Sequence, residues 1–311
     1  MTEFKMFRRL SVWTLMVGLM CWFGFAQMAL AGQEKSQEQS KPQAVASPGA
    51  ATYVGAETCK GCHEQQFKQL EGTQHFKTTF EKGRGEAWHG CESCHGPGSA
   101  HVEGGGDKSK IVTFKGMSQK DISARCMSCH ETNAEHMNFD RSAHSKSGVG
   151  CTTCHSVHQP KETQYLLVNK QTDLCYSCHG QVKADFAKPF RHRVNEGLIS
   201  CSDCHNAHGS RPRQLRASPT QDAVCYKCHS DKKGPFVFEH EVVKAEGCQA
   251  CHTPHGSTHP RLLTRPTVNS MCLECHAGIP NGPHPQSTKS QACTMCHSQI
   301  HGSNTSNVFF R

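Results

Sequence analysis

The pattern of apolar and polar positions separates one strongly apolar stretch from a long polar remainder. Residues 10–25 form a nearly continuous apolar run, with basic residues before it and Ala29-Leu30-Ala31 after it. A basic segment, an apolar core and an A-x-A site are typical of a secretory signal peptide. We therefore expect residues 1–31 to be a signal peptide that is cleaved on export.

Two alternatives remain for this apolar segment. Its length approaches the roughly 20 residues of a spanning helix, so it could be an uncleaved anchor. Cys21 would allow a lipoprotein, although Gly18-Leu19-Met20 is a poor lipobox. Cleavage would leave 280 residues and remove Cys21. Residues 32–52 are polar and contain proline, which predicts a disordered linker.

The remainder of the chain has no apolar run of spanning length, and the mean hydropathy is −0.60. Leu, Ile and Val are too sparse to bury the surface that would offset the entropy of ordering so long a chain. Either the chain is disordered, or something other than side chains forms its core. We expect little regular secondary structure, with short α-helices at the cysteine motifs described next.

The 311 residues include 21 Cys and 23 His, an unusually high content of both residue types. Apart from Cys21, every cysteine lies in one of ten CxxCH motifs. The cysteine pairs are Cys59/Cys62, Cys91/Cys94, Cys126/Cys129, Cys151/Cys154, Cys175/Cys178, Cys201/Cys204, Cys225/Cys228, Cys248/Cys251, Cys272/Cys275 and Cys293/Cys296. The motif histidines are His63, His95, His130, His155, His179, His205, His229, His252, His276 and His297.

This spacing suits the attachment of c-type haem. The two thiols add to the two vinyl groups of one porphyrin, and the following histidine then becomes the proximal ligand of the iron. Zinc ribbons use CxxC pairs but have no reason to place a histidine after each pair. Thioredoxin-like motifs occur singly on a βαβ pattern that is absent here. The sequence therefore predicts ten covalently bound haems, about 28 residues per haem, whose porphyrins form the core.

The remaining histidines recur with the motifs. The chain divides into five doublets, which begin at Cys59, Cys126, Cys175, Cys225 and Cys272, at spacings of 67, 49, 50 and 47 residues. Each doublet has an intervening histidine between its two motifs and a trailing histidine after the second, and such periodicity is typical of stacked repeats. The intervening histidines are His75, His144, His192, His240 and His284, and the trailing ones are His101, His158, His208, His255 and His301.

These ten histidines give every haem a candidate sixth ligand, so we predict bis-His, low-potential haems. His89 is an alternative to His101, whereas His136 and His259 are surplus, more typical of surface or packing positions. Methionine is the competing ligand, but outside the motifs the exported chain offers only Met117, Met137 and Met271, without periodicity. No motif is CxxCK, so no substrate-binding iron is evident.

The string GVGCTTCHSVH at residues 148–158 poses the question of whether one stretch can supply both ligands of one iron. A residue three positions after His155 lies on the same face as His155 if the segment is helical. We therefore expect His158 to serve a different haem, that of Cys126/Cys129 in its own doublet. His208 and His255 should behave in the same way.

The charge balance changes sign once haem is included. The formal net charge of +8 becomes +6 without residues 1–31, and ten haems would add roughly 20 propionate charges, partly offset by ferric iron. Nucleic acid is therefore excluded as a partner, because binding it requires a basic face. Five arginines could compensate propionates or, alternatively, form a docking patch for a partner: Arg191, Arg193, Arg211, Arg213 and Arg216.

Ten CxxCH motifs in an exported chain of this size resemble the periplasmic decahaem cytochromes of the MtrA/DmsE/PioA type. The strings CESCHGPGSAH (residues 91–101) and GVGCTTCHSVH look like motifs of that family, and the resemblance covers residues 53–302. It implies an elongated, haem-packed cytochrome domain over these residues, followed by a tail at 303–311. It also implies a location in the periplasm, in association with the outer membrane.

The function implied by this resemblance is an electron conduit and not an enzyme. In that family the cytochrome is sheathed by a porin-like outer-membrane barrel, and it connects a periplasmic or inner-membrane donor with a cell-surface cytochrome or reductase. Such a conduit would pass electrons to or from extracellular partners. The alternatives are a soluble periplasmic carrier, an electron-feeding subunit of a terminal reductase, a multihaem nitrite or hydroxylamine reductase, and an assembly or storage protein.

The haem count is directly measurable. We expect about ten haems per purified chain, because every motif has the complete attachment chemistry. A pyridine haemochrome assay against total protein, with the intact mass of the holoprotein, checks this number. A count far below ten would contradict the prediction.

Overall fold

The computed structural model describes residues 50–80, 89–210, 215–216, 221–277, 284 and 290–311. The chain divides into two units, Met1–Ala50 and Ala51–Arg311. The predicted signal peptide and the predicted linker up to residue 49 lie outside the described residues. The fold described below is that of the second unit.

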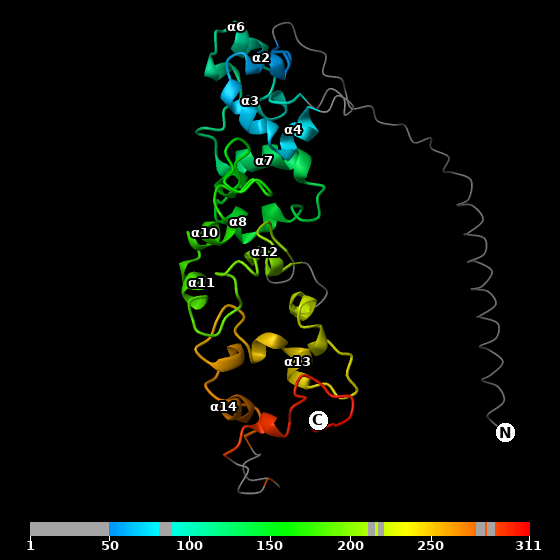
Figure 1. Cartoon of the computed structure of the whole chain (residues 1–311). Helices are drawn as coiled ribbons and strands as arrows, with labels where there is room; N and C mark the ends of the chain where they lie inside the picture. Colours follow the sequence, from blue (N-terminus) through cyan, green and yellow to red (C-terminus); the bar gives the residue numbers. More distant parts are fainter. Residues whose placement is uncertain (1–49, 81–88, 211–214, 217–220, 278–283, 285–289) are drawn as a thin grey trace, which may run out of the picture. The chain divides into compact units, whose positions relative to one another are not determined.

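Short helices joined by irregular chain make up this unit (Figure 1). Doublet one contains α2 (Ala56–Lys60), α3 (Glu64–Glu71), α4 (Gln74–Thr79), α5 (Glu92–His95), α6 (Ser99–Glu103) and the 3-10 helix η2 (Lys108–Lys110). Doublet two contains α7 (Gln119–His130), η3 (Phe139–Arg141), α8 (Ala143–Lys146) and α9 (Cys151–Cys154). Doublet three contains α10 (Gln171–Tyr176), α11 (Gly180–Asp185) and α12 (Cys201–Cys204).

The last two doublets are built in the same way. Doublet four contains η4 (Gln221–Lys227), η5 (Ser230–Lys232), α13 (Glu241–Ala245), η6 (Cys248–Ala250) and η7 (Pro260–Leu262). Doublet five contains α14 (Val268–Leu273) and η10 (Cys293–Met295). The described residues form isolated β-bridges and no longer strand. The prediction of short helices with little other regular structure is confirmed.

Each CxxCH motif forms a single helical turn. Outside α7, which includes the whole of the third motif, the motif histidine donates its backbone N–H to the carbonyl of the first cysteine at 2.8–3.0 Å. Side-chain caps start several of these elements, because a hydroxyl can accept one of the N–H groups that a helix start leaves unpaired. Ser118 Oγ caps α7 in this way, and Thr267 Oγ1 caps α14. The motif sequence therefore specifies its own local geometry.

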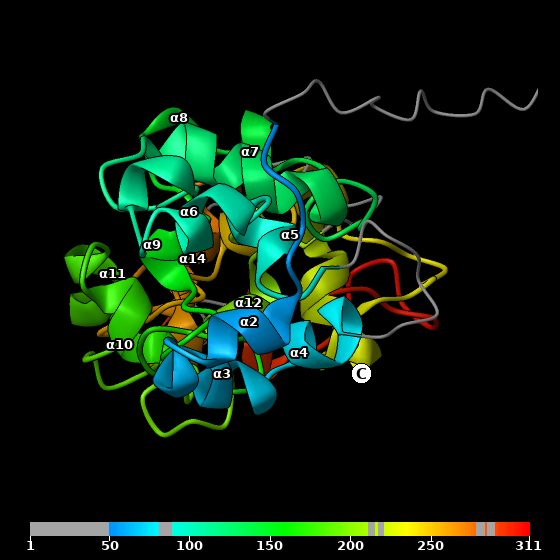
Figure 2. The same cartoon turned by 90° about the horizontal axis from the view of Figure 1, so that it is seen from above.

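Consecutive motifs are packed against each other. Helix α7 contacts α9, α10 contacts α12, α12 contacts η4, and α14 contacts η10. Helices α2 and α3 lie side by side in Figure 1 and again in the rotated view of Figure 2, in agreement with their contacts. Neighbours along the sequence are thus also neighbours in space.

Polar side chains join the two motifs of a doublet. The buried carboxylate of Glu92, which is 2% exposed, accepts backbone N–H groups from Val54, Gly55 and Gly98 at 2.7–3.2 Å. In the other doublets a side chain of the first motif's helical segment accepts an N–H at the start of the second motif. The acceptors and donors are Ser123 with Cys151, Gln171 with Ser202, Asp222 with Cys248, and Asn269 with Cys293.

Buried apolar side chains are few, as the composition predicts. The buried hydrophobic residues are Phe67, Leu70, Ile122, Phe139, Leu167, Phe186, Val194 and Val224. The main aromatic group is Phe67, Phe76 and Phe80, with ring centroids 4.4–5.7 Å apart. Side chains alone therefore form no continuous core among the described residues.

The segment after residue 302 is packed, which differs from the tail expected there. Ser303 is 1% exposed and exchanges backbone hydrogen bonds with Phe238 at 2.8 and 2.9 Å. The carbonyl of Val308 accepts from His297 Nδ1 at 2.6 Å. Residues 303–311 thus belong to the folded unit, because they complete contacts of the last two doublets.

The described part of the chain has no helix whose length and apolar character would allow it to cross a bilayer.

Candidate haem-binding sites

The structure places the predicted ligand histidines in facing pairs. Each motif histidine has its ring centroid 5.9–6.4 Å from that of one intervening or trailing histidine. The pairs, with the motif histidine first, are His63/His101, His95/His158, His130/His75, His155/His208, His179/His144, His205/His255, His229/His192, His252/His301, His276/His240 and His297/His284. All twenty predicted histidines take part.

This separation fits two ligands of one metal. An imidazole nitrogen lies about 2.0–2.1 Å from a bound first-row metal ion, so two nitrogens on opposite sides of it are about 4 Å apart. The ring centroid lies about 1 Å behind the nitrogen, which gives a centroid distance of about 6 Å. With a CxxC pair beside each motif histidine, the residues fit a covalently attached haem between the two rings.

Most pairs connect different doublets. An intervening histidine faces the first motif histidine of the next doublet, as His144 faces His179. A trailing histidine faces the second motif histidine of the preceding doublet, as His208 faces His155. The pairs of the first and the last motif differ from this pattern. His101 faces His63, and His284 faces His297, within their own doublets.

The expected partner of His158 is therefore wrong. His158 does lie away from His155, but it faces His95 of doublet one and not His130 of its own doublet. His208 and His255 likewise face the preceding doublet, at His155 and His205. The backbone of the trailing segments packs against the preceding doublet, as Gly209 does against Asn138 and Gly256 against Asp185.

Backbone carbonyls fix the ring orientation of the second motif histidine. His95, His155, His252 and His297 donate from Nδ1 to the carbonyls of Val112, Tyr165, Arg261 and Val308 at 2.6–2.8 Å. A donated Nδ1–H leaves Nε2 unprotonated and available to a metal, as in other metal sites where the second ring nitrogen is bonded. These carbonyls hold the rings at Nδ1, on the side away from Nε2.

A left-handed residue follows three of these carbonyls. Leu166, Leu262 and Phe309 have φ of 54°, 60° and 61°, an unfavourable conformation for residues with a Cβ. The carbonyls of these three residues accept the N–H of Ser156, Thr253 and Gln299 respectively. Sequence reasoning missed these residues, although the recurring strings YLL, RLL and VFF, nine to eleven residues after the motif histidine, carried a signal.

The intervening histidines are supported from the next doublet. His144 Nδ1 donates to the carbonyl of Ala207 at 2.9 Å, and His192 Nδ1 donates to that of Pro254 at 2.6 Å. Each acceptor immediately precedes a trailing histidine. Each trailing segment therefore has two roles. Its backbone carbonyl orients an intervening histidine of the preceding doublet, and its own histidine faces a motif histidine of that doublet.

A glycine after the trailing histidine allows this close approach. A Cβ at Gly209 would lie 2.9 Å from the carbonyl oxygen of Asn138, and one at Gly256 would meet the carbonyl oxygen of Asp185. Only glycine, which has no side chain, permits that contact. The recurring string HGS at residues 208–210, 255–257 and 301–303 was the sequence signal for this contact, and it was missed.

The cysteines follow the same serial order. Within each doublet the first cysteines of the two motifs share a side-chain hydrogen bond. These thiol pairs are Cys59/Cys91, Cys126/Cys151, Cys175/Cys201, Cys225/Cys248 and Cys272/Cys293.

Between doublets, the second cysteine of the second motif lies near the first motif of the next doublet. Burial raises the pKa of Cys94, and the neighbouring Cys129 raises it further. The pKa of Cys154 is raised by burial and by Cys178, and that of Cys251 by burial and by Cys275. Cys204 follows the pattern, since burial and then Cys225 raise its pKa.

Six of the predicted attachment cysteines are exposed. The first cysteine of every motif is partly buried, and the exposed six are all second cysteines: Cys62, Cys129, Cys178, Cys228, Cys275 and Cys296. Five of these belong to the first motif of a doublet, in which only the first cysteine is hydrogen-bonded to the other motif. Cys296 belongs to the second motif of doublet five. The attachment role of these six cysteines stays a prediction from the motif.

Burial favours the neutral, metal-binding form of the candidate ligands. Burial, followed by the neighbouring imidazoles of His136 and His155, lowers the pKa of His208 to about 4. Burial is also the largest cause that lowers the pKa of His301 to about 4. A ligating histidine must be deprotonated, so these rings are already in the required state at neutral pH.

The surplus histidines have other surroundings. His89, the alternative to His101, stacks on Tyr53 with ring centroids 3.6 Å apart, while His101 faces His63. His259 immediately precedes η7, and its backbone N–H donates to Ser257 Oγ at 2.9 Å. His136 lies beside His130 and His208, with centroids 5.3 and 4.4 Å away.

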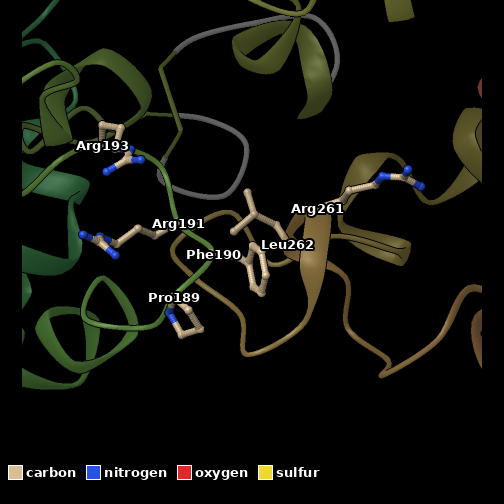
Figure 3. A pocket seen from close by; sticks show the side chains of 6 residues that line it. All are labelled: Pro189, Phe190, Arg191, Arg193, Arg261 and Leu262. Atoms are coloured by element: carbon tan, nitrogen blue, oxygen red, sulfur yellow. The ribbon is translucent and has the colours of Figure 1, made fainter.

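The described arginines of the basic cluster are paired with protein groups. Arg191 Nη2 and Arg193 Nη1 lie 2.6 and 3.2 Å from Glu196 Oε1. Arg191 and Arg193 line a hollow with Arg261, and Figure 3 shows the guanidinium groups of Arg191 and Arg193 extending to the opposite side from that of Arg261. Arg216 pairs with a carboxylate too, that of Glu135 at 3.0 Å. These arginines do not converge on one anion site, and Arg211 and Arg213 lie outside the described residues.

Comparisons with known proteins agree with this geometry. The family model of the doubled CXXCH motif matches residues 144–184, 192–234 and 240–280, and that of cytochrome c554 and c-prime matches residues 100–156. Each doubled-motif match begins at an intervening histidine and includes the motif histidine that it faces.

Several curated proteins are similar to parts of the chain. The multiheme cytochrome MtrA of Shewanella baltica is 33% identical over 142 residues, which cover 44% of this chain and 41% of MtrA. The C-type polyheme cytochrome OmcC of Geobacter sulfurreducens is 30% identical over 35% of this chain and 15% of its own length. The cytochrome c-type protein NrfB of Escherichia coli is 26% identical over 41% of this chain and 66% of its own length.

The doubled motifs indicate covalently bound c-type haems, as in a multihaem c-type cytochrome. The partial match to MtrA and the motif models support a cytochrome of the MtrA type.

The close approach at Gly256 gives a test of the packing between doublets. Gly256→Ala should destabilise the holoprotein by about 1–3 kcal/mol, because the new methyl group must displace the backbone of Asp185. Chemical denaturation followed by the Soret absorbance measures the change. Gly180→Ala is the matched control, since nothing lies within 4 Å of its Cβ position. Equal stability of the two variants would show that the contact is not maintained.

Proposed function

We propose that the chain is a periplasmic decahaem cytochrome with ten bis-His haems, exported by a cleaved signal peptide, that conducts electrons through an outer-membrane barrel. The observation that carries this proposal is the complete set of facing histidines, one pair for each of the ten motifs. In this proposal the motif cysteines and histidines attach the haems, and the intervening and trailing histidines are the sixth ligands.

A carrier fits this arrangement better than an enzyme. A reductase that binds nitrite or hydroxylamine at iron needs a position open to substrate. Here each motif histidine already faces a second imidazole at ligand distance. Two imidazoles per iron leave no place for substrate, so the bound haems would supply one-electron couples and no substrate chemistry.

The order of the cysteines supports conduction along the whole unit. Hydrogen bonds between first cysteines connect the two motifs of a doublet, and the second cysteine of each second motif is close enough to the next doublet for a cysteine there to raise its pKa. The resulting series runs from the motif of Cys59 to the motif of Cys293 without a break. Electrons could therefore enter at one end of the series and leave at the other.

The two terminal ligand pairs define the ends of this series. His101 and His284 return to motifs of their own doublets, so the first and last haems would depend on no further repeat. We propose that a periplasmic or inner-membrane donor cytochrome meets one end and a cell-surface cytochrome or reductase meets the other. The direction of flow would follow from the potentials of these partners.

A barrel sheath would explain how such a chain serves a membrane. Irregular backbone at membrane depth is tolerated only where protein or water, and not lipid, surrounds it. The described chain consists of short helices and irregular segments, so it would need a protein sheath. The resemblance of the motifs to decahaem cytochromes of the MtrA type supports this role. The second candidate is a soluble periplasmic carrier or an electron-feeding subunit of a reductase.

The ligand assignment makes a specific prediction for His158. His158→Ala should convert one low-spin ferric haem in the set to high spin, because the haem facing His95 loses its second imidazole. Electron paramagnetic resonance of the oxidised holoprotein detects the new signal. His259→Ala is the control, since His259 faces no motif histidine among the ring pairs of the described residues.

A second step identifies the haem that His158 serves. In a background without the attachment cysteines Cys91 and Cys94, His158→Ala should add no high-spin signal, because the affected haem is already missing. In a background without Cys126 and Cys129 the signal should persist. The reverse result would assign His158 to its own doublet and contradict the cross-doublet arrangement.

The conduit role is tested by purification from native membranes. We expect the holoprotein to co-purify with an outer-membrane barrel protein, identified by mass spectrometry, and we expect depletion of the cytochrome to abolish reduction of extracellular acceptors. Purification without a barrel, together with intact reduction of these acceptors, would exclude the conduit. It would leave the soluble carrier as the function.

A further inference from the structure

A buried carboxylate lies between the two motifs of doublet four. Asp222 is 7% exposed, and the backbone N–H of Cys248 donates to both of its carboxylate oxygens, with N–O distances of 3.1 Å. A carboxylate oxygen of Asp222 and the Sγ atoms of Cys225 and Cys248 all lie within 4.8 Å of one another. In the proposed holoprotein these sulfurs are bonded to the seventh and eighth porphyrins, so the carboxylate lies beside both macrocycles.

The same position in two other doublets carries an uncharged side chain. Asp222, Ser123 and Asn269 each lie three residues before the first cysteine of their doublet. Ser123 Oγ accepts the backbone N–H of Cys151 at 3.3 Å, and Asn269 Oδ1 accepts that of Cys293 at 3.3 Å. The hydrogen bond is therefore common to the three doublets, whereas only doublet four among them has a negative charge at this position.

Doublet one reaches a similar arrangement from its second motif. Glu92 follows the first cysteine of that motif, and its two carboxylate oxygens accept backbone N–H groups of Val54 and Gly55, before the first motif. The charge of Glu92 acts on both first cysteines of the doublet, Cys59 and Cys91. Doublets one and four thus each hold a buried carboxylate beside their two first cysteines.

Two carboxylates near first cysteines of other doublets are exposed. The charges of Asp140 and Asp203 act on Cys151 and Cys201, but both aspartates lie at the surface. Salt and water screen exposed charges much more than buried ones. The buried carboxylates of doublets one and four should therefore act more strongly on the neighbouring haems.

A fixed negative charge beside a haem favours the oxidised state. Ferric iron carries one more positive charge than ferrous iron, and a nearby anion in the protein interior stabilises that additional charge by Coulomb attraction. The sign of this effect follows from the net charge of the carboxylate and does not depend on its orientation. Both oxygens of Asp222 accept a hydrogen bond, as expected of an ionised carboxylate, which has no proton to donate.

We propose that Asp222 lowers the reduction potentials of the seventh and eighth haems, and that Glu92 lowers those of the first and second. The proposal rests on the proposed attachment of haems at these four motifs. Electrons that move along the series would meet haems at doublets one and four that these charges make harder to reduce.

The repeat offers reciprocal variants of nearly equal shape. Asp222→Asn removes the charge from doublet four and should raise the potentials of its two haems, as Glu92→Gln should in doublet one. Asn269→Asp adds a charge to doublet five and should lower the potentials there. For each affected haem we expect about a tenfold change in the ratio of ferric to ferrous form at a given potential, about 59 mV for one electron.

Two control variants separate charge from other effects. Asn269→Ser places the residue of doublet two in doublet five, so it changes the hydrogen bonds without adding a charge. Asp140→Asn removes an exposed charge. Neither control should shift the potentials.

Spectroelectrochemical titration of each holoprotein measures the number of reduced haems against the applied potential. The area between the curves of a variant and the parent equals the sum of the individual shifts, so overlapping haems need no separate assignment. Shifts of opposite sign for Asp222→Asn and Asn269→Asp would support the proposal, and curves that coincide with the parent in both would overturn it. If either exchange loses a haem, Ser123→Asp takes its place, and a curve not shifted to lower potential would overturn the proposal.

Mass spectrometry of haem peptides from the parent protein tests the proposed function separately. Absence of haem at the motifs of Cys225 and Cys248 would overturn both proposals. A full set of haems with unshifted curves would overturn only the role of the buried carboxylates.

Discussion

An iron that binds two imidazoles needs them on opposite sides, about 6 Å apart between ring centres, and the rest of this structure is organised around that separation. A CxxCH motif is one helical turn and supplies one imidazole only. The second must come from elsewhere in the chain. In eight of the ten facing pairs it comes from the adjacent doublet.

In the proposed holoprotein this exchange of ligands would hold neighbouring repeats together, although few apolar side chains are buried among the described residues. The segment around a trailing histidine contributes an imidazole to the preceding doublet, and its backbone carbonyl supports an intervening histidine, as Ala207 supports His144. Glycines such as Gly256 bring the two backbones into contact. In the proposed holoprotein, removal of one doublet would leave irons in both neighbours with a single imidazole, so the repeats should fold as one cooperative series.

The sequence was sufficient for the local features. The ten motifs, their helical turns and the set of twenty histidines all follow from residue types and spacing, because attachment chemistry requires them within a few residues of one another. The partner of each histidine did not follow. His158 could have served the haem of its own doublet or that of a neighbour, since sequence distance does not say in which direction a trailing segment turns. The left-handed residues Leu166, Leu262 and Phe309 were missed for the same reason, because their role depends on a carbonyl that meets a ring ten residues away.

The amino-acid sequence alone indicates a multihaem c-type cytochrome, because each of the ten CxxCH motifs contains, within five residues, the side chains that covalent haem attachment requires. It also determined the short helices, because each motif closes its own turn. The folded chain is needed to see that histidines face motifs of neighbouring doublets and that the terminal pairs lie within their own repeats. The two rings of a facing pair come from segments that are distant in the sequence. The path of the chain between repeats, with its close backbone contacts at Gly209 and Gly256, therefore determines which histidine faces a given motif.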